Sequence, residues 1–370
     1  MARELPVHYE GNTIYNIQIE SGFNKLILGL KKLNYDSTIK ICIISDSNVS
    51  PLYAKELEEK LKENYFNIFL FVFSAGEPQK NLNTVQHLYE YLVENHFERR
   101  DLLLALGGGV VGDLTGFTAA TYLRGIDFIQ IPTSLLSQVD SSIGGKTGVD
   151  FLKYKNMVGA FYMPKLVYIN LSVLKTLPEK EFISGMGEII KHGLIKNKEY
   201  FRWLSENREH ILARNMDALE HMIYESCLIK RAIVEKDPKE KGERALLNFG
   251  HTIGHAVEMK TDFVLLHGEC VSLGIVSALY LSYRLGHISQ EEFENTVLLL
   301  NAYHLPTKLD ISCRDAGEIS AKEILTVSKS DKKMEAGTVK FVLLKSIGNA
   351  VIDRNIDDDQ LLEAIEVLFR

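Results

Sequence analysis

Two histidines, His251 and His255, stand four residues apart in a glycine-flanked segment. If that segment is helical, the two imidazoles lie on one face, and such a separation suits metal binding. A zinc protease would place glutamate directly after the first histidine, but this chain has Thr252 there, so that chemistry lacks its general base. The pair therefore indicates a metal site that still needs a carboxylate and a further imidazole.

A third histidine and a carboxylate in an apolar stretch complete a possible ligand set. His267 stands just before an expected helix, and Glu188 falls inside an otherwise apolar one. One glutamate and two histidines leave coordination positions open, which is the pattern of a catalytic zinc site. The residues alone do not choose among the candidates, because His192 lies four residues after Glu188 and His255 lies four after His251.

Three successive glycines, Gly107, Gly108 and Gly109, follow an expected strand and precede an expected helix. Because glycine has no side chain, backbone N–H groups at such a helix start can approach a pyrophosphate closely. A plain tight turn would need only one glycine. The run therefore favours a dinucleotide site, although its spacing differs from the usual G-x-G-x-x-G.

Charged residues follow other expected strands of the first half. Asp46 and Glu77 lie after strand ends, where a carboxylate can bind ribose hydroxyls or, alternatively, only cap a helix or face solvent. The segment that begins at Asp140 ends like a nucleotide-triphosphate loop, but aspartate replaces the first glycine, which excludes a P-loop kinase. We expect a flexible loop here, with Lys146 and the later Lys155 binding carboxylate or phosphate oxygens.

The elements that must position these residues alternate in type in the first half. Short β-branched runs alternate with longer amphipathic stretches, the rhythm of βαβ units with a mostly parallel sheet. Strands are predicted at 39–45, 68–74, 101–106 and 127–131, and helices at 53–64, 82–95 and 110–122. We therefore expect an α/β, Rossmann-like N-terminal domain.

The second half has mainly helical periodicity. Helices are predicted at 179–195, 216–235, 269–285, 290–302 and 359–368, with strands at 339–344 and 350–353 around a Gly348-Asn349 turn. The change of pattern after Leu177 predicts two domains, 1–177 and 178–370, of which the second is mainly α-helical.

The bulk composition limits the possible partners. The chain has 370 residues, 46% of them hydrophobic, and a formal net charge of -7, so it does not attract nucleic acid or an anionic membrane as a whole. Its four cysteines are widely spaced and fit neither a disulfide framework nor a zinc ribbon: Cys42, Cys227, Cys270 and Cys313. We find no apolar signal core or spanning segment, so a cytoplasmic location is expected.

Several stretches of this chain together resemble the 3-dehydroquinate synthase family of sugar phosphate cyclases. They are 107–113, 122–125, 132–136, 138–149, 155–161, 174–178, 187–193, 247–255 and 266–269. The resemblance implies an NAD-binding first domain, a metal- and substrate-binding second domain, one divalent metal (zinc or cobalt) and a homodimer. It also implies a phosphate-eliminating lyase of the shikimate pathway, which makes 3-dehydroquinate from 3-deoxy-D-arabino-heptulosonate 7-phosphate. The implied steps are NAD-mediated oxidation, β-elimination, reduction and intramolecular aldol closure.

By position, the resemblance implies a role for individual residues. Glu188, His251 and His267 would be the metal ligands, which leaves His255 as a substrate contact. The implied NAD contacts are Asp46, Glu77, Lys80, Gly108, Gly109, Val110, Asp113, Thr133, Ser134, Lys146, Lys155, Leu174, Lys175 and Thr176. The implied catalytic residues are Lys146, Lys191, Arg244, Asn248 and His255. The implied substrate-binding residues are Asp140, Asn156, Lys230 and Lys333, with Lys332 as an alternative to Lys333, and Arg124 reaching into the partner subunit's site.

Three other functions are compatible with parts of the sequence. A paralogous cyclase would act on a sugar phosphate without the carboxylate, and a metal-dependent polyol dehydrogenase would release NADH. A non-catalytic NAD sensor would have lost its metal ligands. The intact loop around Lys146 and the complete ligand set favour the phosphate-eliminating cyclase.

Overall fold

The computed structural model describes residues 3–152, 154–262, 264–309, 319–330, 341–353 and 355–370. The chain divides into two compact units, one of Met1–Leu177 with Lys230–Pro238 and the other of Pro178–Ile229 with Lys239–Arg370. Helix α8 (Met216–Lys236) contributes residues to both units. The expected domain boundary near Leu177 stays a prediction.

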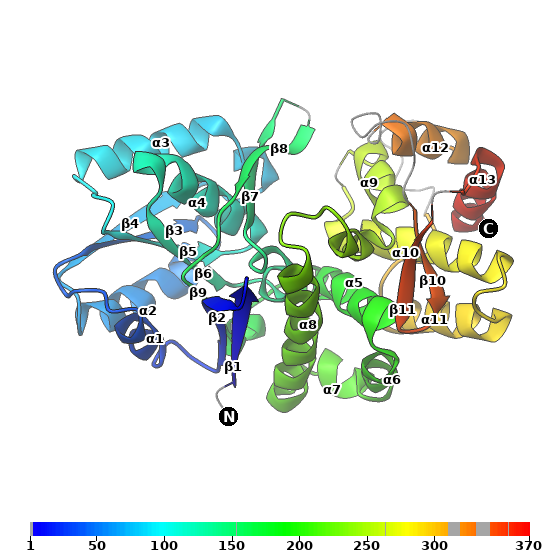
Figure 1. Ribbon diagram of the computed structural model, residues 1–370, viewed down its shortest axis with the longest axis horizontal. Coiled ribbons are helices and arrows are strands. Elements are labelled where there is room, and N and C mark those ends of the chain that lie inside the picture. The colour runs from blue at the N-terminus through cyan, green and yellow to red at the C-terminus, as the bar shows by residue number, and fades with distance from the viewer. Residues whose placement is uncertain (1–2, 153, 263, 310–318, 331–340, 354) are drawn as a thin grey trace. The chain divides into compact units, whose positions relative to one another are not determined.

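The first unit is built on a seven-stranded sheet with the order β1-β2-β9-β6-β5-β3-β4 (Figure 1). Its neighbouring strands are parallel, except that β1 and β2 form an antiparallel hairpin at one edge. The strands are β1 (Arg3–Tyr9), β2 (Asn12–Glu20), β3 (Lys40–Asp46), β4 (Asn67–Phe73), β5 (Leu102–Gly107), β6 (Asp127–Pro132) and β9 (Leu166–Asn170). The mostly parallel, Rossmann-like sheet predicted from the βαβ rhythm is thus confirmed.

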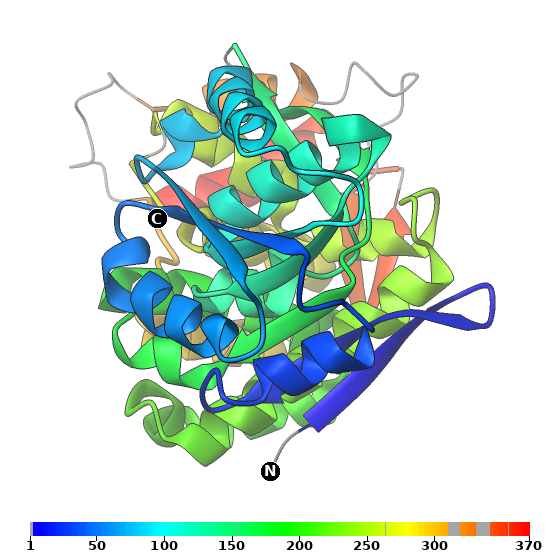
Figure 2. The ribbon, with the colours of Figure 1, turned by 90° about the vertical axis from the view of Figure 1, so that its left-hand side faces the viewer.

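Alternation along the strands explains why helices cover both faces of this sheet. The helices are α1 (Leu26–Lys32), α2 (Ser50–Lys62), α3 (Leu82–Glu94) and α4 (Gly109–Thr121). Ile41 and Ile43 of β3 belong to a core shared with α1 and α2, whereas Cys42 and Ile44 belong to a core shared with α3 and α4. Because successive side chains point to opposite faces, one apolar strand serves both cores. Figure 2 shows the two helix layers on either side of the sheet.

An antiparallel hairpin of β7 (Lys146–Phe151) and β8 (Tyr154–Phe161) stands where we expected a flexible loop. Gly148 pairs with Gly159 across the hairpin, and a Cβ on Gly159 would lie 2.3 Å from the carbonyl oxygen of Thr147. The expectation of a loop was wrong for residues 146–148, where the glycines permit close pairing of two strands, whereas residues 142–145 before them form neither helix nor strand.

The second unit is mainly helical, as predicted. Its helices besides α8 are α5 (Glu179–Lys196), α6 (Lys198–Glu206), α7 (Arg208–Leu212), α9 (His251–Lys260), α10 (His267–Arg284), α11 (Gln290–Ala302), α12 (Ala321–Ser330) and α13 (Asp358–Glu366). Strands β10 (Phe341–Ser346) and β11 (Asn349–Asp353) form an antiparallel hairpin. Within the described ranges, the helices lack the combination of length and apolar character that a membrane crossing requires.

Helix α10 is the central element of this unit, because it contacts α5, α9, α11, α13 and β10. A Cβ on Gly268 of α10 would lie 1.7 Å from the carbonyl oxygen of Ser184 in α5. A Cβ on Gly274 would lie equally close, 1.7 Å, to the carbonyl oxygen of Gly250, just before α9. Only glycine leaves room for such contacts. They fix the starts of α9 and α10 beside α5.

The predicted helices and strands occur with their ends shifted by a few residues, and residues 339–340 of one predicted strand lie outside the described ranges. Strands β1, β2 and β9 were not predicted. In β2, buried residues alternate with partly exposed ones, which is the pattern of a half-buried strand and was overlooked, and β9 is only five residues long. The helices α1, α6, α7 and α12 were missed because they have only 5 to 10 residues, too few for a clear helical period.

Candidate metal centre and nucleotide site

Glu188 is a fully buried carboxylate in the middle of α5. Its neighbours Ile189 and Ile190 are also fully buried, so this part of the helix is enclosed by protein. A buried charge is costly unless it is paired. Lys191, almost one turn later, is buried as well and forms an ion pair with Glu188. The pair allows both charges to remain inside the fold.

His251 and His267 are the first residues of α9 and α10. Gly250 precedes His251 with a φ of 80°, a left-handed conformation that favours glycine. The Nδ1 atom of His251 lies 3.2 Å from the carbonyl oxygen of Phe249. A hydrogen bond from Nδ1–H to this carbonyl leaves Nε2 as the electron-pair donor. The turn before α9 therefore sets both the position and the tautomer of His251.

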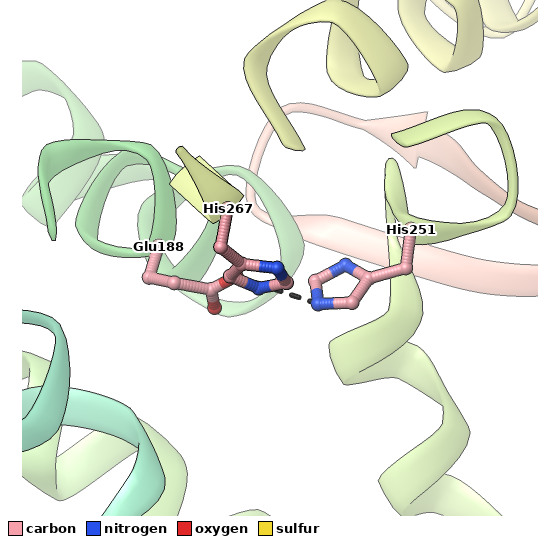
Figure 3. A group of neighbouring side chains, drawn as sticks. All are labelled: Glu188, His251 and His267. Carbon is pink, nitrogen blue, oxygen red and sulfur yellow. Dashed lines mark ion pairs between the residues drawn. The ribbon is translucent and has the colours of Figure 1, made fainter. Parts of the chain in front are cut away.

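The side chains of Glu188, His251 and His267 converge from three segments of the chain (Figure 3). Oε1 of Glu188 lies 3.4 Å from Nε2 of His251 and 3.6 Å from Nε2 of His267. One possible ligand atom from each residue lies within 4.8 Å of the other two. Ligand atoms bound about 2.1 Å from a tetrahedral zinc ion are about 3.4 Å apart. The observed separations therefore fit one metal ion.

The charges around this centre favour the metal-binding forms of Glu188 and His251, whereas at His267 a metal ion has to displace a proton. Burial raises the pKa of the Glu188 carboxyl, but Lys191 and the two histidines outweigh burial and hold that pKa well below its usual range. Burial, together with Lys191, lowers the pKa of His251 well below its usual value. Burial also lowers the pKa of His267, but contacts with Glu188 and Glu258 outweigh it and raise the pKa to about 9. Glu188 is thus anionic and His251 neutral at neutral pH.

His255 lies beside the three converging side chains without joining them. Its ring centroid is 5.2 Å from that of His251 and 6.0 Å from that of His267. With His267 and Glu258 it forms a second group of possible ligand atoms, while His192 is fully buried and lies outside these two groups. Glu258 was not predicted, although its place seven residues after His251, on the same face of a helix, is a signal that could have found it.

Two further predicted residues belong to the 3-10 helix η5 (Glu243–Asn248), which leads into α9. Arg244 is buried, and the Nδ2 of Asn248 donates a hydrogen bond of 3.2 Å to Oε1 of Glu240. Glu240 was not predicted, because nothing in its local sequence distinguishes it from a surface acid. The structure thus places a buried guanidinium and an amide–carboxylate contact on the segment before the metal centre.

The glycine turn of the first unit joins β5 to α4. The N–H of Thr133 donates to the carbonyl oxygen of Gly107 over 2.9 Å, and a Cβ on Gly108 would lie 3.6 Å from Oγ of Ser134. Gly108, Gly109 and Val110 are all partly exposed. Partly exposed backbone N–H groups at a helix start, next to hydroxyl side chains, suit the oxygens of a pyrophosphate.

Lys80 brings several predicted residues of the first unit together. Its Nζ lies 2.7 Å from Oδ2 of Asp113 and donates a 2.5 Å hydrogen bond to Oδ1 of Asn156. Burial lowers the pKa of Lys80, but the carboxylates of Asp113 and Glu77 outweigh burial and raise it. Burial raises the pKa of Asp113 even against the opposing charge of Lys80. Lys155 lies 3.8 Å from Glu77, which completes a connected group of charges.

Three other predicted residues of this unit occupy turns and strand ends. Asp140, in the π-helix η3 (Ser137–Ser141), forms an ion pair with Lys230. Lys146 is exposed at the start of β7. Arg124 is exposed and has a φ of 66°, directly after Leu123 with a φ of 51°. Two successive non-glycine residues in this conformation store backbone strain, which is often found at functional positions.

Asp46 has a visible structural role. Its Oδ1 accepts hydrogen bonds from the N–H groups of Asn48 at 2.8 Å and Val49 at 2.9 Å, so the carboxylate shapes the turn before α2. The carboxylate does not cap the helix itself, because the N-cap of α2 is Val49 and has no side-chain cap hydrogen bond. A contact between Asp46 and a ribose stays a prediction.

The last predicted nucleotide contacts lie at the end of the first unit. Leu174 is buried and Lys175 exposed in the 3-10 helix η4 (Leu171–Lys175), and the hydroxyl of Thr176 is hydrogen-bonded to that of Tyr53. Lys333 and its alternative, Lys332, lie outside the described residues.

Two protein-family models match consecutive parts of the chain. The model described as 3-dehydroquinate synthase N-terminal matches residues 70–184, and the model described as 3-dehydroquinate synthase C-terminal matches residues 185–334. The 3-dehydroquinate synthase of Acetivibrio thermocellus is 44% identical over 328 residues, which cover 89% of this chain and 89% of that protein. The similarity therefore extends over both compact units.

Two solved structures are similar over nearly the whole chain. The 2-epi-5-epi-valiolone synthase of Streptomyces hygroscopicus, with NAD+ and Zn2+ bound, has a TM-score of 0.87 at 24% identity, covering 98% of this chain and 99% of that one. A 2-deoxy-scyllo-inosose synthase complexed with carbaglucose-6-phosphate, NAD+ and Co2+ has a TM-score of 0.87 at 22% identity over the same shares. At these identities the likeness shows a shared fold.

Proposed function

The chain belongs to the 3-dehydroquinate synthase family, and on that premise we propose that it converts 3-deoxy-D-arabino-heptulosonate 7-phosphate to 3-dehydroquinate and phosphate. The observation that carries the proposal is the convergence of Glu188, His251 and His267 at separations that fit one metal ion. This activity would make the chain a lyase of the shikimate pathway, which supplies aromatic amino acid biosynthesis.

A divalent metal ion, zinc or cobalt, would be held by one carboxylate oxygen of Glu188 and the Nε2 atoms of His251 and His267. When bound in this way it supplies a Lewis acid that polarises a hydroxyl or carbonyl of the substrate. Three protein ligands leave room in the coordination sphere for substrate oxygen. The presence of Zn2+ and Co2+ in the two solved cyclases supports this assignment.

NAD would bind at the glycine turn between β5 and α4, where the N–H groups of Gly108 and Gly109 can donate to its pyrophosphate. Bound there, NAD would supply reversible hydride transfer with the substrate, with no net change in the cofactor over a turnover. Further contacts are proposed for Asp46, Glu77, Lys80, Val110, Asp113, Thr133, Ser134, Lys146, Lys155, Leu174, Lys175 and Thr176. The ion pair between Lys80 and Asp113 supports this assignment, because it fixes a buried cation beside the start of α4.

The substrate carries a carboxylate and a phosphate, so an acidic chain must bind it with local cations. In the second unit the cations proposed for this are Lys191 and Arg244, both of which are buried. In the first unit they are Lys146 and Lys230. Asp140, Asn156, Asn248 and His255 would orient substrate hydroxyls, and Lys333 would add a further cation.

We also propose that the chain works as a homodimer in the cytoplasm, with Arg124 reaching the partner subunit's substrate. The exposure of Arg124 and the strained backbone at Leu123 and Arg124 support this role. Arg124→Ala should lower activity while leaving metal and NAD affinities unchanged. A sedimentation measurement that finds only monomer under assay conditions would contradict the dimer.

The test is an assay of phosphate release from the heptulosonate phosphate by the purified chain, with NAD and a divalent metal, before and after chelation. We expect phosphate and 3-dehydroquinate in equal amounts, no net NADH, and loss of activity on chelation. Net NADH would instead indicate a polyol dehydrogenase, and turnover only of a sugar phosphate without the carboxylate would indicate a paralogous cyclase. A folded, metal-loaded chain that releases no phosphate would overturn the proposal.

A further inference from the structure

The imidazole of His267 lies between two buried carboxylates of the second unit. Its Nε2 is 3.6 Å from Oε1 of Glu188, and its Nδ1 is 3.9 Å from Oε2 of Glu258. The two ring nitrogens therefore face different acids. Glu188 belongs to the proposed metal centre, whereas the mechanism above gives Glu258 no role.

Glu258 is held firmly in place by the packing of its helix. It is 6% exposed and lies on α9, which is pressed against α10 where a Cβ on Gly254 would be 2.8 Å from the carbonyl oxygen of Cys270. A buried carboxylate needs a cationic or hydrogen-bonding neighbour to offset its lost hydration. His267, at the start of α10, supplies such a neighbour.

The two histidines of the metal centre have the same arrangement of contacts. In each, Nε2 is turned to Oε1 of Glu188. In each, Nδ1 is turned to an acceptor, which is the carbonyl oxygen of Phe249 at 3.2 Å for His251 and the carboxylate of Glu258 at 3.9 Å for His267. An acceptor at the second nitrogen fixes the tautomer and ring orientation of a metal-ligating histidine.

We propose that Glu258 is a positioning residue for the metal centre, which accepts a hydrogen bond from Nδ1–H of His267 and so presents Nε2 of that ring to the metal ion. The inference rests on the proposed function only in requiring that a metal binds at Glu188, His251 and His267. The separation of 3.9 Å is an ion-pair distance, so the proposal requires the ring and the carboxylate to come within hydrogen-bonding distance when the metal binds. A carboxylate acceptor also makes the imidazole a stronger donor to metal than a carbonyl does.

A different role for Glu258 is as a direct ligand, because His255, Glu258 and His267 also place possible ligand atoms close together. The arrangement favours positioning, because His267 cannot serve both groups through the same nitrogen while Nε2 faces Glu188. The two roles differ in metal stoichiometry. A positioning residue leaves one metal ion per chain, whereas a ligand of a second site adds another.

The experiment measures metal affinity of the full chain, stripped with a chelator and titrated with Zn2+ against a chromophoric competitor. We expect Glu258→Gln to weaken Zn2+ binding by about 10- to 100-fold, the usual effect of losing such an outer contact. Glu258→Asp, which keeps the charge, should recover part of the loss. The matched control is Glu323→Gln. Glu323 of α12 forms an ion pair over 2.9 Å with Lys260, which lies on the same helix as Glu258, and Glu323 is the more exposed of the two acids.

Titration with Co2+ gives a spectroscopic measurement that would not change if Glu258 had only a structural role. With Glu258→Gln we expect one Co2+ per chain, as in the unsubstituted chain, with an altered visible absorption spectrum because the His267 donor has changed. NAD affinity, measured alongside, should be unchanged and confirms folding. Unchanged Zn2+ affinity, an equal loss in the Glu323→Gln control, or two Co2+ ions falling to one would each overturn the proposal.

These measurements also separate this inference from the proposed function. A chain that binds one metal ion with the expected dependence on Glu258, yet releases no phosphate from the heptulosonate phosphate, would contradict only the proposed function. A chain that releases phosphate but binds metal equally well with Glu258→Gln would contradict only the role of Glu258. A chain that binds no metal would overturn both.

Discussion

The glycine turn of the first unit and the metal centre of the second hold their polar groups by different means. At the turn, the proposed contacts follow β3, β4, β5 and β6, whose carboxyl ends share one edge of a parallel sheet. At the metal centre, the side chains come from α5, α9 and α10, and contacts at glycine fix the starts of α9 and α10 beside α5. The first arrangement offers backbone N–H groups, and the second offers buried side chains.

This difference determines which substitutions should affect which ligand. The turn needs space for the backbone to approach an anion, and its charges pair with one another, as Lys80 does with Asp113. The metal centre needs a buried anion, Glu188, whose charged form is favoured by Lys191, His251 and His267. We therefore expect NAD affinity and metal affinity to respond to separate sets of changes.

Glu188→Gln should have the largest effect on activity of the substitutions considered. It tests whether the metal centre acts separately from the glycine turn. The amide cannot replace the anionic ligand, and Lys191 loses its buried counter-charge. Phosphate release should fall by on the order of 1,000-fold or more, with NAD affinity unchanged in a binding titration. Glu199→Gln, an exposed control on α6 paired with Arg202, should keep full activity. Equal losses of metal and NAD binding would show that the two regions do not act separately.

Lys80→Met should affect the stability of the first unit and its binding of NAD. Removing one partner of a buried ion pair leaves Asp113 and Asn156 without their cation, which should lower the free energy of unfolding by about 3 kcal/mol. NAD affinity should fall as well, while the Zn2+ affinity of the folded chain stays the same. Urea unfolding and the two binding titrations measure these effects. A fall in Zn2+ affinity as large as the fall in NAD affinity would contradict the separation.

Gly268→Ala tests whether a close backbone contact supports the metal centre. A Cβ there would lie 1.7 Å from the carbonyl oxygen of Ser184, so the start of α10 must move away from α5. Overpacking of this kind should lower the free energy of unfolding by about 1–3 kcal/mol and weaken Zn2+ binding through the displacement of His267. Gly22→Ala is the control, because a Cβ there meets nothing within 4 Å. An unchanged Zn2+ affinity would show that α10 does not position its first residue.

The same contrast explains what the sequence could predict. The sequence predicts β3 and β5 from their apolar runs and α5 from a helical pattern sustained over many residues. These patterns depend only on neighbouring residues, so the elements were found with small shifts of their ends. The proposed ligands Glu188, His251 and His267 were candidates from residue type and local setting, and the family resemblance selected them. Their mutual distances depend on residues far apart in the sequence, such as Gly268 against Ser184.

Glu258 and the hairpin of β7 and β8 show where local patterns fail. The position of Glu258 places it on the helix face of His251, but its contact with His267 exists only because α10 packs beside α9. The glycines of the hairpin look like those of a mobile loop, and only the pairing of Gly148 with Gly159 shows that they allow two strands to approach. In both cases the deciding contact is formed by a partner that the local sequence does not name.

Glu323→Gln should have the smallest effect on the free energy of unfolding. It shows what an exposed ion pair contributes, in contrast to the buried pair at the metal centre. Glu323 is a partly exposed acid whose pKa is lowered below 4.5 by a hydrogen bond from Lys260, with a further bond from the Ser320 N–H. An acid with a lowered pKa in the folded state stabilises it above pH 4.5, and this contribution is lost as the pH falls through the lowered value. Because the pair is solvated, its contribution at pH 7 should be small. Urea unfolding of both chains at pH 7 and at pH 3 should therefore show a small difference that shrinks on acidification, whereas a large difference at pH 7 would mean that burial is not what sets the metal centre apart.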